Sequence, residues 1–128
     1  MSAYIENEFG LIKIDDQVIA TIASDAAMKC YGVVGLVNAS ASESIINLLS
    51  KESLSEGIVL KIEDNSLNID VSVILEFGVK IAVVCQNIIE TIKFQVEHET
   101  GIRVNEINVI VRDIRLQDQE VKNVNNRW

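Results

Sequence analysis

The chain has 128 residues, of which 48% are apolar and 23% charged, and 11 basic against 19 acidic residues give a net charge of −8. These proportions are those of one folded domain and exclude an intrinsically disordered chain. Proteins that grip a phosphate backbone gain affinity from clustered cations, so this acidic chain, which has no basic stripe, is not expected to bind nucleic acid.

The N-terminus and the lack of a long apolar run predict a cytoplasmic protein. Residues 1–8 lack the positive charge and continuous apolar run of a secretory signal. No apolar stretch approaches the ~20 residues that a membrane-spanning helix requires, so we expect no direct membrane insertion and membrane association only through a partner. Cys30 and Cys85 lie in apolar helical patterns, and we expect small buried side chains rather than a disulfide.

The first third of the chain predicts a strand followed by a helix. Ile12 and Ile14 lie on one side of a short strand, and Asp15 or Asp16 can cap the helix that follows. Apolar residues recur every three or four positions along this helix, at Val18, Ile19, Ile22, Ala23, Ala26, Ala27 and Cys30. Gly32 is expected to end it.

The middle of the chain predicts a strand, a short helix and a hairpin. Residues 33–37 form a short apolar strand, and capping-box spacing predicts a short helix over residues 40–49. A hairpin follows, with arms over residues 58–62 and 67–77 and its turn at residues 64–66. Apolar and polar residues alternate in the second arm, which is typical of a strand with one buried face.

The last third predicts a long helix and a final strand. The period is helical from Lys80 to Glu99, and Gly101 stops it. A strand then begins at Ile102, shifts phase at Asn105 as a bulge would, and continues to residue 111.

These elements predict an α+β fold with two layers, a mixed β-sheet with two main helices, plus one short helix, packed on one face. The chain has no proline and no repeat to mark a domain boundary. We therefore expect an N-terminal extension over residues 1–9, one domain over residues 10–116, and a polar C-terminal tail over residues 117–128.

The residues that could support catalysis do not form a complete motif. His98 is the only histidine, and a metalloprotease motif would need a second one at Ile102. A pair of His98 with Cys30 or Cys85 stays open, although both cysteines lie in apolar stripes that disfavour a thiolate. A calcium-like run from Asp64 lacks the glycine such a loop needs. We expect no catalytic residue, no cofactor and no metal site.

Several apolar residues are left over once the core is filled. Val83 and Phe94 lie on the otherwise polar face of the long helix. Val59, Ile74 and Ile110 fall on the side of the sheet away from the helices. If these three lie on adjacent strands, they form a surface for self-association or for a partner.

The order of six segments resembles the alkaline-shock or general-stress protein family of Gram-positive bacteria. The segments are residues 10–14 (GLIKI), 18–23 (VIATIA), 32–36 (GVVGL), 69–73 (IDVSV), 76–78 (EFG) and 100–109 (TGIRVNEINV). The resemblance implies a small, non-enzymatic cytosolic protein linked to cell-envelope stress, tethered in some members by a membrane anchor protein and tied in others to lipid metabolism. Ala82 departs from the family, which often has a proline at the start of the long helix.

Three functions follow from the sequence. The first is a protein-interaction domain that forms homo-oligomers and docks a protein partner, such as a membrane anchor protein or a lipid-metabolism protein, in cell-envelope stress response or homeostasis. The second is a small-ligand or lipid-binding domain linked to lipid metabolism, with a pocket between helices and sheet. A third, RNA binding, is disfavoured by the net charge of −8 and would use the glycine-flanked turn at residues 32–35, which has the spacing of a KH-domain loop but two valines inside it.

Overall fold

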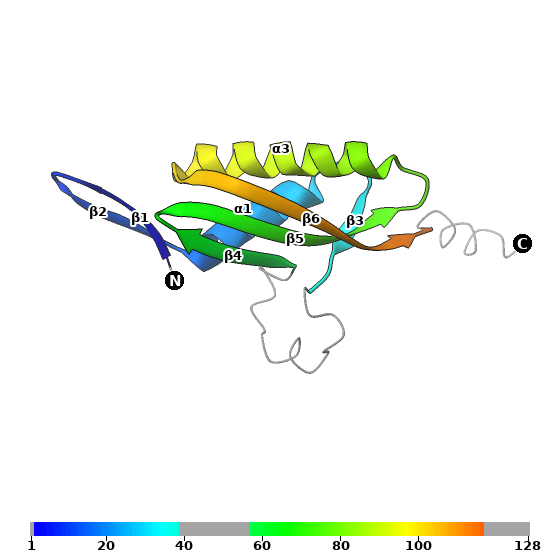
Figure 1. Ribbon diagram of the computed structural model, residues 1–128, viewed down its shortest axis with the longest axis horizontal. Helices are drawn as coiled ribbons and strands as arrows, with labels where there is room; N and C mark the ends of the chain where they lie inside the picture. Colours follow the sequence, from blue (N-terminus) through cyan, green and yellow to red (C-terminus); the bar gives the residue numbers. More distant parts are fainter. Residues whose placement is uncertain (1, 39–56, 117–128) are drawn as a thin grey trace, which may run out of the picture.

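The computed structural model describes residues 2–38 and 57–116 (Figure 1). The elements in chain order are β1 (Ser2–Asn7), β2 (Gly10–Asp15), α1 (Asp16–Met28), β3 (Val33–Leu36), β4 (Ile58–Glu63), β5 (Ser66–Glu76), α3 (Ile81–Thr100) and β6 (Arg103–Arg115). The α+β class and both main helices are confirmed. The short helix predicted over residues 40–49 and the tail from residue 117 lie outside the described residues.

Strand β5 is the centre of a mixed four-stranded sheet. β6 runs parallel to it along its whole length, and α3 connects the two (Figure 1). On the other edge, β3 and β4 both run antiparallel to β5 and occupy successive parts of it. They meet at Ser72, whose N–H donates to Gly57 O at 2.9 Å and whose carbonyl accepts from Val37 N at 3.1 Å. β3 and β4 therefore act as one edge strand that is interrupted between Val37 and Gly57.

Both helices pack on one face of the sheet, as the alternation in β5 predicts. Every second residue of β5 is fully buried on that face, namely Leu67, Ile69, Val71, Val73 and Leu75. They join one core cluster with Ile19 of α1 and with Ile88 and Ile92 of α3. Burying each such side chain contributes about 1.5–3 kcal/mol. The small buried residues of α1, which are Ala20, Ala23, Ala26 and Ala27, let the helix lie close to its neighbours.

Local signals set the ends of the helices. Asp15 is the N-cap of α1, since its Oδ2 accepts from Gln17 N at 3.1 Å. The prediction that Gly32 ends this helix is wrong, because the C-cap is Lys29 in right-handed conformation. Gly32 serves the turn that follows, with φ +88°. Gly101 ends α3 as predicted, with φ 78°.

The residues before Gly10, for which the sequence predicts no element, form β1 and pair with β2 in a separate two-stranded sheet. Figure 1 shows this hairpin projecting from one end of the molecule. Its base is held by the fully buried Ala3 and by Asn65, whose side chain bonds both backbone polar groups of Tyr4. We call residues 2–15 the arm.

Candidate interaction site

The residues considered for catalysis do not come together in the described part of the chain. No group of three or more His, Cys, Asp or Glu side chains there is placed to hold a metal ion. His98 is exposed and stacks on Phe94, with ring centroids 5.4 Å apart and planes at 7°. Cys85 lies on the same helix, and about 20 Å of helix separates it from His98. The Cys85–His98 pair that the sequence left open is therefore not formed.

Both cysteines are free, as predicted. Cys30 is buried, and its Sγ donates to Ala26 O at 3.5 Å. Burial raises the pKa of the Cys85 thiol, which reduces the fraction of reactive thiolate near neutral pH. The two thiols are placed for packing rather than for nucleophilic attack.

The outer face of the sheet brings Val59, Ile74 and Ile110 onto the adjacent strands β4, β5 and β6. They surround Ser72, which Ile110 faces in register. Val59 is 37% exposed, but only 8% of Ile74 is exposed. Arg112, at a second bulge of β6 that the sequence did not reveal, donates from Nε to Ser72 Oγ at 3.3 Å. This face therefore carries a small apolar patch, to which Ile74 adds little surface.

Polar side chains on the same face bond one another. Asn108 Nδ2 donates to Asp70 Oδ1 at 2.9 Å and to Glu106 Oε2 at 3.0 Å. Asn105 Nδ2 donates to Asn68 Oδ1 at 3.0 Å, and Asn105 is the extra residue of the predicted bulge. Asn68 and Asp70, which follow Asp64 in the calcium-like run of the sequence, thus join β5 to β6.

On the outward side of α3, the structure places Val83 and Phe94 as the sequence predicts. They are 63% and 66% exposed. They lie about three turns apart, and Asn87 and Glu90 fall on the same line of the helix between them. The outward side of α3 therefore has an exposed apolar residue at each end, Val83 and Phe94, and polar residues between them.

Val83 also lines a groove that the sequence does not reveal. The groove has a volume of about 600 Å³, opens at the surface, and is lined by Tyr31, Ala82, Val83, Val84, Gln86, Asn87 and Glu90. Tyr31 comes from the connection between α1 and β3 and is 77% exposed, whereas the other residues belong to α3. An aromatic side chain and the first turns of a helix thus form an open apolar surface. We call it the α3 groove.

A tight turn holds Tyr31 beside α3. At Gly32, a Cβ would lie 3.2 Å from Val79 Cγ1 and 3.3 Å from Val84 Cγ2, and φ is in the left-handed region. Cys30 on the other side of Tyr31 is buried. The sequence gives no sign of this site, because the groove forms only when α3, distant in the chain, packs beside the turn.

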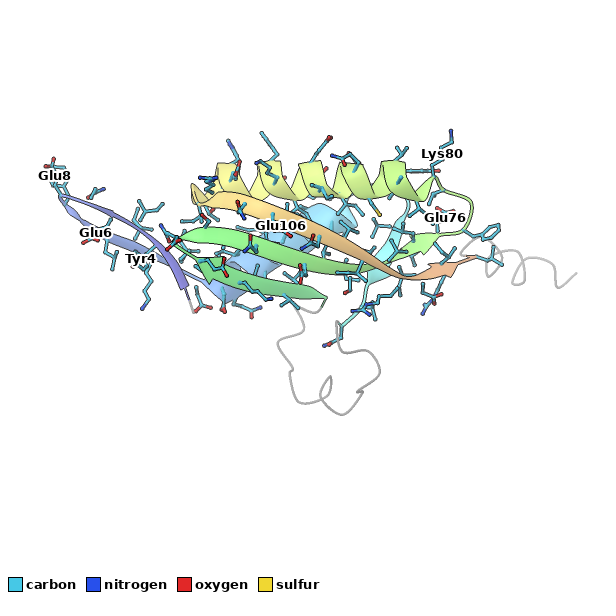
Figure 2. The ribbon with its side chains drawn as sticks, in the orientation of Figure 1. Tyr4, Glu6, Glu8, Glu76, Lys80 and Glu106 are labelled. Atoms are coloured by element: carbon cyan, nitrogen blue, oxygen red, sulfur yellow. The ribbon has the colours of Figure 1, made fainter. Side chains whose placement is uncertain are left out.

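One end of the α3 groove adjoins an uncapped helix N-terminus. Lys80 occupies the N-cap position without a side-chain hydrogen bond, and the first turn contains no acidic residue. The N–H groups of that turn and the helix dipole leave partial positive charge there. Figure 2 shows Lys80 with Glu76 at this end of the molecule. Glu90 lies about three turns further along the helix, at the other end of the groove.

A family comparison covers almost the whole described chain. Residues 4–116 match the model of the alkaline shock protein 23 family, which is described by a cell envelope-related function. The chain belongs to this family. The resemblance drawn from six short segments of the sequence is thereby confirmed.

Relatives of this alkaline shock protein 23 family chain match it over most of its length. Spy1614 of Streptococcus pyogenes serotype M6 is 37% identical over 117 residues, covering 91% of this chain and 97% of the relative. YloU of Bacillus subtilis strain 168 is 32% identical over 117 residues, covering 91% and 98%. A stress response regulator gls24 homolog of Streptococcus pyogenes serotype M3 is 24% identical over 110 residues, covering 86% and 62%.

The comparison with solved structures gives only weak similarities. A variant of MamM CTD superposes with a TM-score of 0.49 and 11% identity, covering 77% of this chain and 94% of that one. This likeness is too low to carry an argument. Neither described helix of this alkaline shock protein 23 family member has the length and hydropathy needed to span a bilayer.

Proposed function

We propose that this chain is a non-enzymatic protein-interaction domain that acts in cell-envelope stress response or homeostasis by self-association and by docking a partner protein. The observation that carries the proposal is the α3 groove, where Tyr31 and Val83 are largely exposed. Aromatic residues beside an apolar hollow are typical of the energetic centre of protein interfaces. A membrane anchor protein or a lipid-metabolism protein is the partner we expect outside self-association.

The groove defines the chemistry of its occupant. Tyr31, Ala82 and Val83 would bury an apolar side chain. Lys80 and the N-terminus of α3 favour a carboxylate at one end, while Glu90 disfavours one at the other. The groove therefore fits a protein segment with an exposed apolar side chain beside an acidic residue.

The other apolar surface residues predicted from the sequence do not line the α3 groove. Phe94, Val59 and Ile110 lie outside the groove, and we assign them to contacts with the membrane anchor or lipid-metabolism protein. Ile74 is buried, so its substitution by a charged residue would unfold the protein and would not report on docking.

The test compares two valine-to-aspartate variants in the native cell. Val83→Asp places a charge in the groove, and Val18→Asp places one on α1, where the valine is 49% exposed. A photo-crosslinking residue at Tyr31 should give discrete protein adducts that disappear with Val83→Asp and persist with Val18→Asp. Val83→Asp should also fail to restore envelope-stress survival to a deletion strain. A folded, abundant Val83→Asp protein that keeps both adducts and survival would refute the proposal.

An apolar small ligand is the second candidate occupant. The volume of about 600 Å³ lies within the range of small-molecule sites, about 300–1,000 Å³. A fluorescent fatty acid that binds the wild-type chain but not Val83→Asp, in the absence of protein adducts at Tyr31, would favour this function.

A further inference from the structure

The tip of the arm carries the two features that the α3 groove requires. Phe9 is 91% exposed and follows Glu8 in the turn. Asn7 Oδ1 accepts hydrogen bonds from Phe9 N at 2.8 Å and from Gly10 N at 3.2 Å. These bonds order the backbone of the turn, so docking would cost little backbone entropy there.

The arm cannot reach the groove of its own molecule. Its base lies at the C-terminal end of α3, where a Cβ on Gly101 would be 3.4 Å from Ile5 Cδ1. The groove lies at the N-terminal end of the same 20-residue helix, about 30 Å away. Figure 2 shows Glu6 and Glu8 at one end of the molecule and Lys80 at the other. Only a second molecule can bring tip and groove together.

The free part of the arm leaves apolar surface uncovered. Leu11 is 57% and Ile12 53% exposed, in contrast to the buried Ala3 at the base. A two-stranded sheet alone in water is marginally stable, so a surface that covers the arm would stabilise it. Burial of this apolar surface against another molecule would be favourable.

Charge favours the groove over a lipid surface. Glu6 and Glu8 make the tip acidic, and the N-terminus of α3 with Lys80 provides positive charge. An anionic bilayer would repel the same tip. The acidic tip is therefore complementary in charge to the Lys80 end of the groove, whereas Glu90 lies at the other end.

We propose that the arm of one copy docks into the α3 groove of a second copy, with Phe9 against Tyr31 and Val83 and with Glu8 towards Lys80. This inference rests on the proposed function, because it names the occupant of the same groove. The contact joins unlike surfaces at opposite ends of the molecule. Two copies therefore close as a reciprocal antiparallel dimer, or several copies extend in a row.

The test is a mixing experiment on the purified full chain by analytical ultracentrifugation. The wild-type chain should self-associate with rising concentration. Phe9→Ser and Val83→Asp should each weaken association about tenfold or more, since each removes a central apolar contact. Phe94→Ser is the matched control, because Phe94 is also exposed but lies outside the groove. A mixture of Phe9→Ser and Val83→Asp should recover a heterodimer, because it contains one intact arm and one intact groove.

A charge exchange tests the orientation. Glu8→Lys and Lys80→Glu should each weaken association, and a mixture of the two single variants should recover it through the restored opposite charges. In parallel, a photo-crosslinking residue at Phe9 should link to the peptide containing Val83 of an isotope-labelled copy, as mass spectrometry would show.

Three outcomes would overturn the inference: a wild-type chain that stays monomeric at its highest soluble concentration, an association that the Phe9→Ser and Val83→Asp mixture does not recover, or Phe9-dependent binding of a monomer to phosphatidylglycerol vesicles. The inference and the proposed function fail separately. If Val83→Asp loses function in cells while Phe9→Ser keeps it, the groove binds another protein, so only the inference is refuted. If both variants keep function, both are refuted.

Discussion

Tyr4 and Asn65, 61 residues apart in the chain, are joined by two hydrogen bonds: Tyr4 N donates to Asn65 Oδ1 at 3.1 Å, and Asn65 Nδ2 donates to Tyr4 O at 2.6 Å. Asn65 has φ 59° and its neighbour Asp64 has φ 50°, values that a two-residue hairpin turn requires and that Asn and Asp tolerate. The turn between β4 and β5 thus also anchors the arm. The Asn65 side chain, together with the buried Ala3, therefore sets the position of the proposed docking tip.

Replacing Asn65 with glycine should loosen the arm without disturbing the turn. Glycine adopts the same positive φ but removes both bonds to Tyr4. We expect the free energy of unfolding to fall by about 1–2 kcal/mol. Amide hydrogen exchange should become faster in residues 2–15. Asp64→Gly is the control, because it changes the same turn and should leave exchange in the arm unchanged. Equal protection of the arm in both variants would contradict the anchoring role.

Enlarging Ala23 should destabilise the helix layer. Ala23 is fully buried in the core cluster, so extra methyl groups have no room there. Ala23→Leu should lower the free energy of unfolding by about 1–3 kcal/mol in chemical denaturation. Val18→Leu, on the exposed side of the same helix, should change it by less than about 0.5 kcal/mol. A stable Ala23→Leu protein would mean that the two layers can move apart.

The parts of the fold that sequence predicts are those with strong local patterns. The alternation through β5 and the stripe along α3 each predict which side of the element faces the common core. Asp15 caps α1 by a hydrogen bond to Gln17 N, and Gly101 ends α3 by its left-handed backbone conformation. Both effects are local to one turn, so the sequence alone predicts them. The bulge at Asn105 is visible as a break in the same alternation.

The arm and the groove depend on contacts between distant segments. β1 is held by Asn65, which no pattern within residues 2–7 indicates. Tyr31 becomes a groove wall only because α3 packs beside it. Ile74 is a further example. Its strand position correctly predicts that it lies on the outer face, but does not predict that it is buried there, with only 8% of its surface exposed. Periodicity gives the direction of a side chain, whereas exposure depends on what lies over it.

Alanine at Gly101 should destabilise the protein through the backbone. Gly101 has φ 78°, and left-handed conformation costs a residue with a side chain about 1–2 kcal/mol. A Cβ there would meet Ile5 Cδ1 at an ordinary contact distance of 3.4 Å, so steric overlap adds little. Gly101→Ala should therefore lower the melting temperature. Gly35→Ala is the control, since a Cβ there meets nothing within 4 Å and its φ is not in the left-handed range. An equal loss in both variants would show that conformation at Gly101 is not the cause.

The Cys85 thiol should titrate at a higher pH than a free cysteine, because burial raises its pKa. The rate of alkylation by iodoacetamide should therefore reach half its maximum at a higher pH than for a free cysteine peptide. The folded state holds this proton more tightly than the unfolded state. Cys85 should accordingly add no pH dependence below the ordinary thiol pKa, and above it the free energy of unfolding should fall as the pH rises. In the Cys85→Ala variant, the free energy of unfolding should fall less as the pH rises above the ordinary thiol pKa. Chemical denaturation at a series of pH values would measure this difference. A half-maximal rate at or below that of the free peptide would mean that solvent reaches the thiol in the native protein.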